Sequence, residues 1–231
     1  MISKERLLLM SGVIVQIYTN EDFTQMRRNI IGMMNNLIPS ASITFFLAKT
    51  DGSCKCTEPM CIGKFTEDGL YDYIENYQHK DHSRYLFADG KSHIYRERDY
   101  FTQDVLMTSE YYNDIYVPAK IKDTLQVAIA KNNTFLGVLT FFRTEEEKDF
   151  TDDDLMQLLL EHLENRLYHE LVEKRAGSGN PSLKQTAAAG ESKEKDIASE
   201  NHLTHREKEI FDLLVQGYSI DALKEHCYIS E

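Results

Sequence analysis

Before residue 176, hydrophobic positions recur at helical spacing at the two ends and at strand spacing between them. A first helix is predicted from about Ser3 to Tyr18, and a second after caps at Thr19 and Asn20, ending at Pro39. The apolar side of the first helix comprises Leu7, Leu8, Val13, Ile14 and Ile17. That of the second comprises Phe23, Met26, Ile30, Met33, Met34 and Leu37.

The middle of the chain carries strand patterns. Ser42 to Ala48 is a β-rich run closed by a turn at Asp51-Gly52, and a cysteine-bearing loop is predicted after it. Leu70 to Tyr77 has helical periodicity, and a short strand is predicted near His93 to Arg96. A tyrosine-rich tract with weak periodicity surrounds that strand.

A hairpin and a long helix complete this region. The strands Leu125 to Ala130 and Phe135 to Phe142 join around Asn132-Asn133, because asparagine tolerates the positive φ of tight hairpin turns. Thr151 is predicted to cap a helix from about 152 to 175. Its apolar stripe is Leu155, Leu159, Leu163, Leu167 and Leu171.

This order of elements predicts an α+β fold, an antiparallel sheet flanked by N-terminal helices and a long C-terminal helix. It occupies residues 1–175. Residues 176–202 consist mainly of Gly, Ser, Ala, Lys and Glu, which predicts a flexible linker spanning roughly 30 Å.

Residues 203–231 have the pattern of a helix-turn-helix. Thr204 is a helix N-cap with Glu207 as its capping-box partner, and Gly217 takes the position that ends this helix. Ser219 caps a second short helix, and Ser230 is placed to cap a third.

This segment resembles the DNA-binding domain of LuxR-type transcriptional regulators. The matching residues are Leu203, Thr204, Arg206, Glu207, Glu209, Ile210, Leu213, Leu214, Gly217, Ser219, Leu223, Ile229 and Ser230. Two positions depart from the family pattern: Lys224 stands where alanine is usual, and Cys227 where leucine is usual.

The resemblance implies DNA contacts by Thr204, Arg206, Ser219 and Ser230, provided that the helix-turn-helix is completed. In the family the helix that enters the major groove begins just after Ser230, and here Glu231 alone follows. The segment carries three Lys/Arg and six Asp/Glu, a formal charge of −3. We therefore expect this partial, all-α segment not to bind DNA by itself.

The first part of the chain resembles a GAF domain, a sensor fold that precedes LuxR-type domains. The points of resemblance are Phe23, Tyr77 with Asp81, Ser109 to Tyr112 leading to Pro118, Leu136-Gly137-Val138, and Phe150-Thr151. This likeness is more diffuse than the one at the C-terminus. It implies a pocket for a small-molecule ligand of unknown identity.

The composition and charge of the chain disfavour some classes of function. The chain of 231 residues is 42% hydrophobic, enough for a real core, and its net charge of −12 disfavours nucleic-acid or membrane-surface binding by the whole chain. No apolar run reaches the length of a membrane span, and no signal-peptide cleavage site follows the first residues, so a cytoplasmic protein is expected.

Nine of the thirteen tyrosines lie between Tyr71 and Tyr116. Tyrosine has an apolar body and a hydroxyl that can orient a ligand, although ordinary half-buried packing explains many single tyrosines. The candidate ligand-binding residues are Tyr85, Phe87, Tyr95, Tyr111 and Tyr116.

Three cysteines, Cys54, Cys56 and Cys61, lie close together. Their C-x-C-x4-C spacing matches no common zinc pattern, so a solvated hairpin loop with incidental cysteines is favoured and no metal site is expected. A thiol-based redox sensor or GAF-fold reductase using these residues is the alternative. His79, Asp81 and His82 are interpreted as solvated residues at a helix end.

No nucleophile elbow, P-loop or dinucleotide fingerprint is present, so neither enzyme activity nor a cofactor is expected. The favoured function is a transcriptional regulator with a small-molecule sensor. A homodimer is expected, because helix-turn-helix readers bind paired half-sites and the first and last helices could pair with a second copy. A ligand-binding or dimerisation module without DNA binding remains a further alternative.

Overall fold

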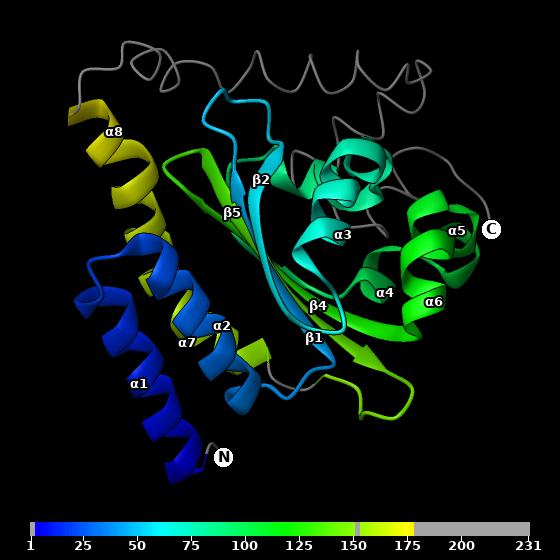
Figure 1. Cartoon of the computed structure of the whole chain (residues 1–231), viewed down its shortest axis with the longest axis horizontal. Coiled ribbons are helices and arrows are strands. Elements are labelled where there is room, and N and C mark those ends of the chain that lie inside the picture. Colours follow the sequence, from blue (N-terminus) through cyan, green and yellow to red (C-terminus); the bar gives the residue numbers. More distant parts are fainter. Residues whose placement is uncertain (1–2, 151–152, 178–231) are drawn as a thin grey trace, which may run out of the picture.

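The computed structural model describes residues 3–150 and 153–177 (Figure 1). Residues 178–202 of the predicted linker (176–202) and the predicted helix-turn-helix, with Thr204, Arg206, Ser219 and Ser230, lie outside the described residues. The first two linker residues, 176 and 177, belong to the last helix instead. No helix of the described part is long and apolar enough to cross a bilayer.

Two antiparallel-packed helices begin the fold, α1 (Lys4–Thr19) and α2 (Phe23–Leu37). The carboxylate of Asp22 caps α2 by accepting a hydrogen bond from the backbone N–H of Gln25, so the predicted caps at Thr19 and Asn20 are wrong. Asn20 follows the end of α1 instead.

The buried side of α1 is narrower than predicted. Val13 and Ile17 are fully buried, whereas Leu7 and Leu8 are 45% and 65% exposed. The predicted placement of these two leucines on the packed side is therefore wrong, because the neighbouring helices cover only one narrow stripe of α1.

Five strands form one antiparallel sheet in the order β2-β1-β5-β4-β3. The strands are β1 (Ser42–Ala48), β2 (Cys56–Gly63), β3 (His93–Tyr95), β4 (Ile121–Lys131) and β5 (Thr134–Thr144). Asn132 and Asn133 join β4 to β5 with φ of 51° and 57°, as the predicted hairpin requires. The predicted α+β fold class is confirmed.

The two edge strands differ from the rest. The predicted cysteine loop is wrong from Cys56 onward, because Cys56–Gly63 pairs with β1 as strand β2. The register of the β1–β2 pairing shifts between Phe45 and Leu47 of β1. On β2 this irregularity falls at Glu58, whose φ is 45°, and Pro59. The other edge, β3, is three residues long.

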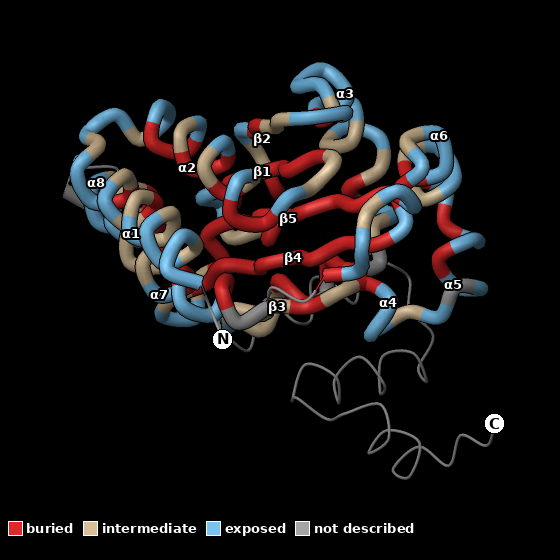
Figure 2. The backbone as a smooth tube through the Cα atoms, turned by 90° about the horizontal axis from the view of Figure 1, so that it is seen from below, coloured by how far each residue is buried: buried red, intermediate tan, exposed pale blue. Residues whose placement is uncertain are grey.

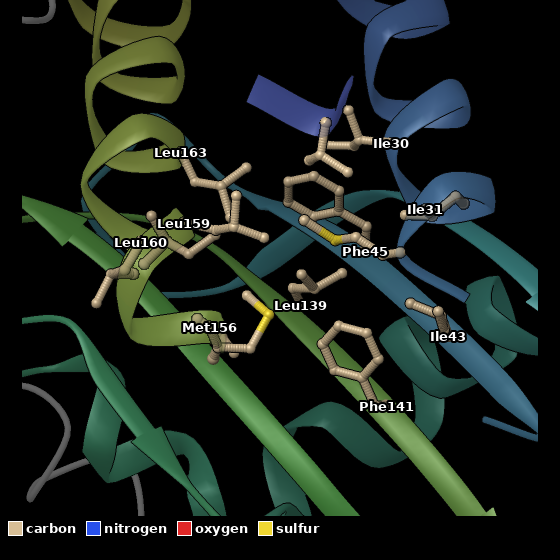
Figure 3. Close-up of a cluster of buried hydrophobic side chains, with 14 of the residues drawn as sticks. Ile30, Ile31, Ile43, Phe45, Leu139, Phe141, Met156, Leu159, Leu160 and Leu163 are labelled. Carbon is tan, nitrogen blue, oxygen red and sulfur yellow. The ribbon is translucent and has the colours of Figure 1, made fainter. Parts of the chain in front are cut away.

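One face of the sheet packs on α2 and the last helix, and α1 packs on the outer side of these two helices (Figure 1). This last helix runs as α7 (Asp153–Tyr168), continues through a π-helical turn (His169–Glu173) and ends as α8 (Lys174–Gly177). All five leucines of the predicted stripe are buried. They meet alternate residues of the strands, such as Phe45, Leu139 and Phe141, in the main core (Figure 3).

Short helical segments cover the opposite face of the sheet, where α3 to α6 lie (Figures 1 and 2). The segments are α3 (Glu67–Asp72), π-helical Tyr73–Tyr77, 3-10 helices Gln78–Lys80 and His82–Phe87, α4 (Glu97–Tyr100), α5 (Gln103–Thr108), π-helical Tyr112–Tyr116 and α6 (Val117–Ala119). The predicted helix from Leu70 thus begins earlier, since Thr66 caps it through the N–H of Gly69.

Candidate functional site

A row of polar side chains crosses the sheet on the face opposite the main core. Thr44 of β1 pairs with Thr140 of β5, which pairs with Gln126 of β4, which pairs with Tyr95 of β3. Because successive side chains of a strand point to opposite faces, these four residues share the face that α3 to α6 cover. Thr44, Thr140 and Gln126 form the floor of the candidate site, and Tyr95 continues the row on the edge strand.

A cavity of about 450 Å³ lies over this floor. Its apolar wall includes Phe46, Phe65, Leu70, Phe87, Ile115, Val138 and Phe142. Its polar lining residues include Thr44, Thr140 and Gln126, the tyrosines Tyr73, Tyr111 and Tyr116, the acidic residues Asp72, Asp81 and Asp114, and Lys64. The volume and the mainly apolar lining are typical of small-molecule sites.

The tyrosines of one wall converge on a buried carboxylate. Glu97 begins α4 and is 4% exposed. Its Oε1 accepts hydrogen bonds from the hydroxyls of Tyr111 (3.0 Å) and Tyr116 (3.2 Å) and from Nε2 of Gln126 (2.8 Å). Its Oε2 accepts one from Oγ1 of Thr124 (3.3 Å).

Burial raises the pKa of Glu97 to about 7, and the negative charge of Asp81 adds to this rise. The hydrogen bonds from Tyr111, Tyr116 and Thr124 oppose it, because they stabilise the carboxylate. Burial and the nearby charges of Asp81 and Glu97 raise the pKa of Tyr111 far above its ordinary value. Burial and the charge of Glu97 raise the pKa of Tyr116 as well. Tyr111 and Tyr116 therefore remain protonated hydrogen-bond donors at neutral pH.

A second carboxylate, Asp81, lies on the cavity wall. Its Oδ2 accepts a hydrogen bond from the Tyr73 hydroxyl (2.5 Å), and its Oδ1 accepts from the N–H and hydroxyl of Ser83 (2.8 and 2.7 Å). Asp81 is half-buried, so its interpretation as a solvated residue is wrong. Burial, with the charge of Asp81, raises the pKa of Tyr73.

Both π-helical turns of this face contribute to the cavity. Tyr73 begins one turn, and Asp114, Ile115 and Tyr116 belong to the other. A hydrogen bond from the Tyr77 hydroxyl to Oδ2 of Asp114 (3.0 Å) joins the two turns. Such turns are frequent at functional sites because the additional residue changes which side chains face inward.

The predicted candidates occupy three kinds of position. Phe87, Tyr111 and Tyr116 line the cavity. Tyr95 is not part of the cavity lining, and its hydroxyl donates to Oε1 of Gln126 on the floor (2.9 Å). The side chain of Tyr85 lies outside the described residues. Glu97 was not predicted as a site residue, because its charged neighbours in the sequence give no sign of burial.

The cysteines are not in a solvated loop. Cys54 and Cys56 are buried, and Cys56 lines the cavity. Burial raises the pKa of the Cys56 and Cys61 thiols, which disfavours the reactive thiolate. Among the described residues, no three His, Cys, Asp or Glu side chains are grouped to hold a metal ion.

No family model and no curated protein matches the sequence. Solved structures do match. CepR2 from Burkholderia cenocepacia, an N-acylhomoserine lactone dependent LuxR family transcription factor, is 12% identical with a TM-score of 0.51, covering 75% of this chain and 99% of that one. Escherichia coli SdiA is 12% identical with a TM-score of 0.50, covering 97% of this chain and 84% of its own.

The free methionine-R-sulfoxide reductase of Neisseria meningitidis, in complex with its substrate, is 14% identical with a TM-score of 0.50. That match covers 76% of this chain and 96% of the reductase. At such identities the likeness concerns the fold alone. The described residues have an α+β fold with a five-stranded antiparallel sheet that resembles GAF-like folds.

Proposed function

We propose that this chain senses a small molecule that binds in the cavity between the sheet and α3 to α6. The observation that carries this proposal is a cavity of about 450 Å³ with apolar walls and converging hydroxyls and carboxylates. Phe87, Tyr111 and Tyr116 would contact the ligand directly. Tyr95 would support the floor through Gln126, and Tyr85 remains a candidate from the sequence.

We infer further that the sensor regulates transcription. The resemblance of residues 203–231 to LuxR-type DNA-binding domains supports this, as does the fold likeness to CepR2. DNA would be bound when the helix-turn-helix is completed, with Thr204, Arg206, Ser219 and Ser230 near the phosphates. Ligand binding would shift the population of sensor conformations, and the last helix leads directly into the predicted linker.

A homodimer is part of the proposal. Leu8, Val15 and Tyr18 are each at least 51% exposed on α1 and follow the spacing i, i+7, i+10 of a helix-pairing seam. The helix carries no charged residue between Leu7 and Thr19. In a chain with a net charge of −12, such a stripe lets two copies meet without opposing carboxylates.

We propose a non-enzymatic role. The thiol-based alternative needs accessible thiolates, whereas Cys54 and Cys56 are buried and the pKa of Cys56 is raised. No described feature favours the reductase alternative over ligand sensing.

The test is isolation of the protein from its native host followed by native mass spectrometry. Wild-type protein is expected to carry an additional small-molecule mass. Val138→Trp, which fills the cavity from β5, is expected to lose it while retaining a cooperative melting transition. Val105→Trp, on the exposed surface of α5, is the matched control and is expected to keep the ligand. Loss of the mass in both variants, or in neither, would contradict the proposed site.

A further inference from the structure

Three tyrosines that line the cavity donate their hydroxyl protons to carboxylates of the protein. Tyr111 and Tyr116 donate to Glu97, and Tyr73 donates to Asp81. A phenol carries a single hydroxyl proton, so each of these hydroxyls can meet a ligand only as a hydrogen-bond acceptor. Toward the cavity, all three therefore act as hydrogen-bond acceptors.

Glu97 fixes the direction in which the hydroxyls of Tyr111 and Tyr116 donate. It lines a separate, smaller cavity of about 230 Å³ and does not line the large one. Four side chains donate hydrogen bonds to its carboxylate. Two of them, Tyr111 and Tyr116, belong to one helical segment, and the other two, Thr124 and Gln126, belong to β4. An ionised carboxylate has no proton to give, so it can only receive the tyrosine protons.

Acidic groups outnumber basic ones in the lining of the large cavity. Three carboxylates line it, and the one cation in its lining, Lys64, donates to the carbonyl oxygen of Ala119 (3.5 Å). On the floor, Oγ1 of Thr44 is buried without a hydrogen-bond partner in the described part of the chain. A buried polar atom without a partner is costly, and a ligand in the cavity would supply one.

We propose that the ligand is an uncharged or cationic hydrogen-bond donor with an apolar body, and that Glu97 is the positioning residue behind this preference. The donor group is a hydroxyl, an amide N–H or an amine. Carboxylates, phosphates and simple esters offer only acceptors and would face lone pairs on Tyr73, Tyr111 and Tyr116. This inference rests on the proposed function, ligand binding in the large cavity.

The experiment compares four probes that share an eight-carbon chain and differ in the head group: octanamide, octylamine, methyl octanoate and octanoate. Each is titrated into the full chain at pH 8, where Glu97 is ionised, and followed by amide NMR spectra. Octanamide and octylamine are expected to bind at least about tenfold more tightly than the ester and the carboxylate, since mismatched buried acceptors lose hydrogen bonds.

The outcomes separate the two levels of inference. Equal or tighter binding of methyl octanoate or octanoate would overturn the donor preference and leave the cavity as the binding site. Binding by none of the four, combined with no ligand mass in the protein from its native host, would overturn the proposed function as well.

Glu97→Gln tests the positioning role. Both tyrosine hydroxyls donate to the same oxygen, Oε1, and a neutral amide at this position is a weaker acceptor than the carboxylate, so it holds the tyrosine protons less firmly. The preference for octanamide over methyl octanoate is expected to fall at least about threefold. Glu67→Gln, a change of the same type at an exposed residue that pairs with Arg28, is expected to leave the preference unchanged.

Tyr116→Phe provides a second variant in case Glu97→Gln does not fold. It removes one acceptor from the wall, so octanamide binding is expected to weaken more than ester binding. An unchanged ratio of the two affinities in every folded variant would overturn the role of Glu97.

Discussion

At the scale of single residues, two opposing effects act on Glu97. Removal from water disfavours its charged form, while four hydrogen-bond donors favour it. Desolvation is the larger effect, because the pKa rises to about 7 from an ordinary value of 4.5. The folded protein consequently holds a proton on Glu97 over a pH range in which the unfolded chain has lost it.

We expect Glu97 to make stability depend on pH. Its contribution is fully present below about pH 4.5 and is lost as pH rises through about 7. Between pH 5 and pH 8 the free energy of unfolding should fall by up to about 3 kcal/mol from this group. Glu97→Gln cannot titrate and should lack this component. Urea unfolding of both proteins at several pH values measures the difference, and parallel pH profiles would contradict it.

The sequence allowed some of the cavity residues to be predicted. Phe87, Tyr111 and Tyr116 were candidates because tyrosines crowd that part of the chain. Glu97 was missed because it lies between Arg96 and Arg98, a pattern that usually marks a solvated surface. Its burial depends on partners 14 to 29 residues away, which no local pattern encodes.

At the scale of elements, locally determined features were predicted best. The two N-terminal helices, the Asn132-Asn133 hairpin and the leucine stripe follow from periodicity and turn chemistry. Strand β2 was missed because Cys56–Gly63 does not alternate regularly and contains Pro59. Of the short helices on this face, the one at Leu70 was predicted, whereas α4, α5 and α6 were missed because they are too short, at three to six residues, to show an apolar periodicity of their own.

Two leucines of α7 should respond very differently to truncation. Leu163 is fully buried in the core, and Leu163→Ala should lower the free energy of unfolding by about 3 kcal/mol through lost burial and a residual cavity. Leu158 is 50% exposed on the same helix, and Leu158→Ala should cost less than about 1 kcal/mol. Chemical denaturation measures both. Similar losses for the two would show that the helix packs differently.

At the scale of the whole molecule, the proposed dimer depends on the uncharged stripe of α1. Val15→Lys places a charge at its centre and should shift the sedimentation of the chain from dimer to monomer at micromolar concentration. Val105→Lys makes the same change at an exposed position of α5 and should leave the dimer intact. A monomeric wild type, or a dimer that survives Val15→Lys, would argue against pairing through α1.

The two edges of the sheet have a consequence for self-association. An exposed edge strand can template further strands from other molecules, which leads to fibrils. Here one edge is interrupted by the irregular pairing at Glu58 and by Pro59, which lacks an N–H, and the other is three residues long. Neither edge offers a long regular ladder of unpaired backbone groups. In the proposed dimer, copies of this domain would therefore meet through their helices at high concentration without the sheet growing from one molecule into the next.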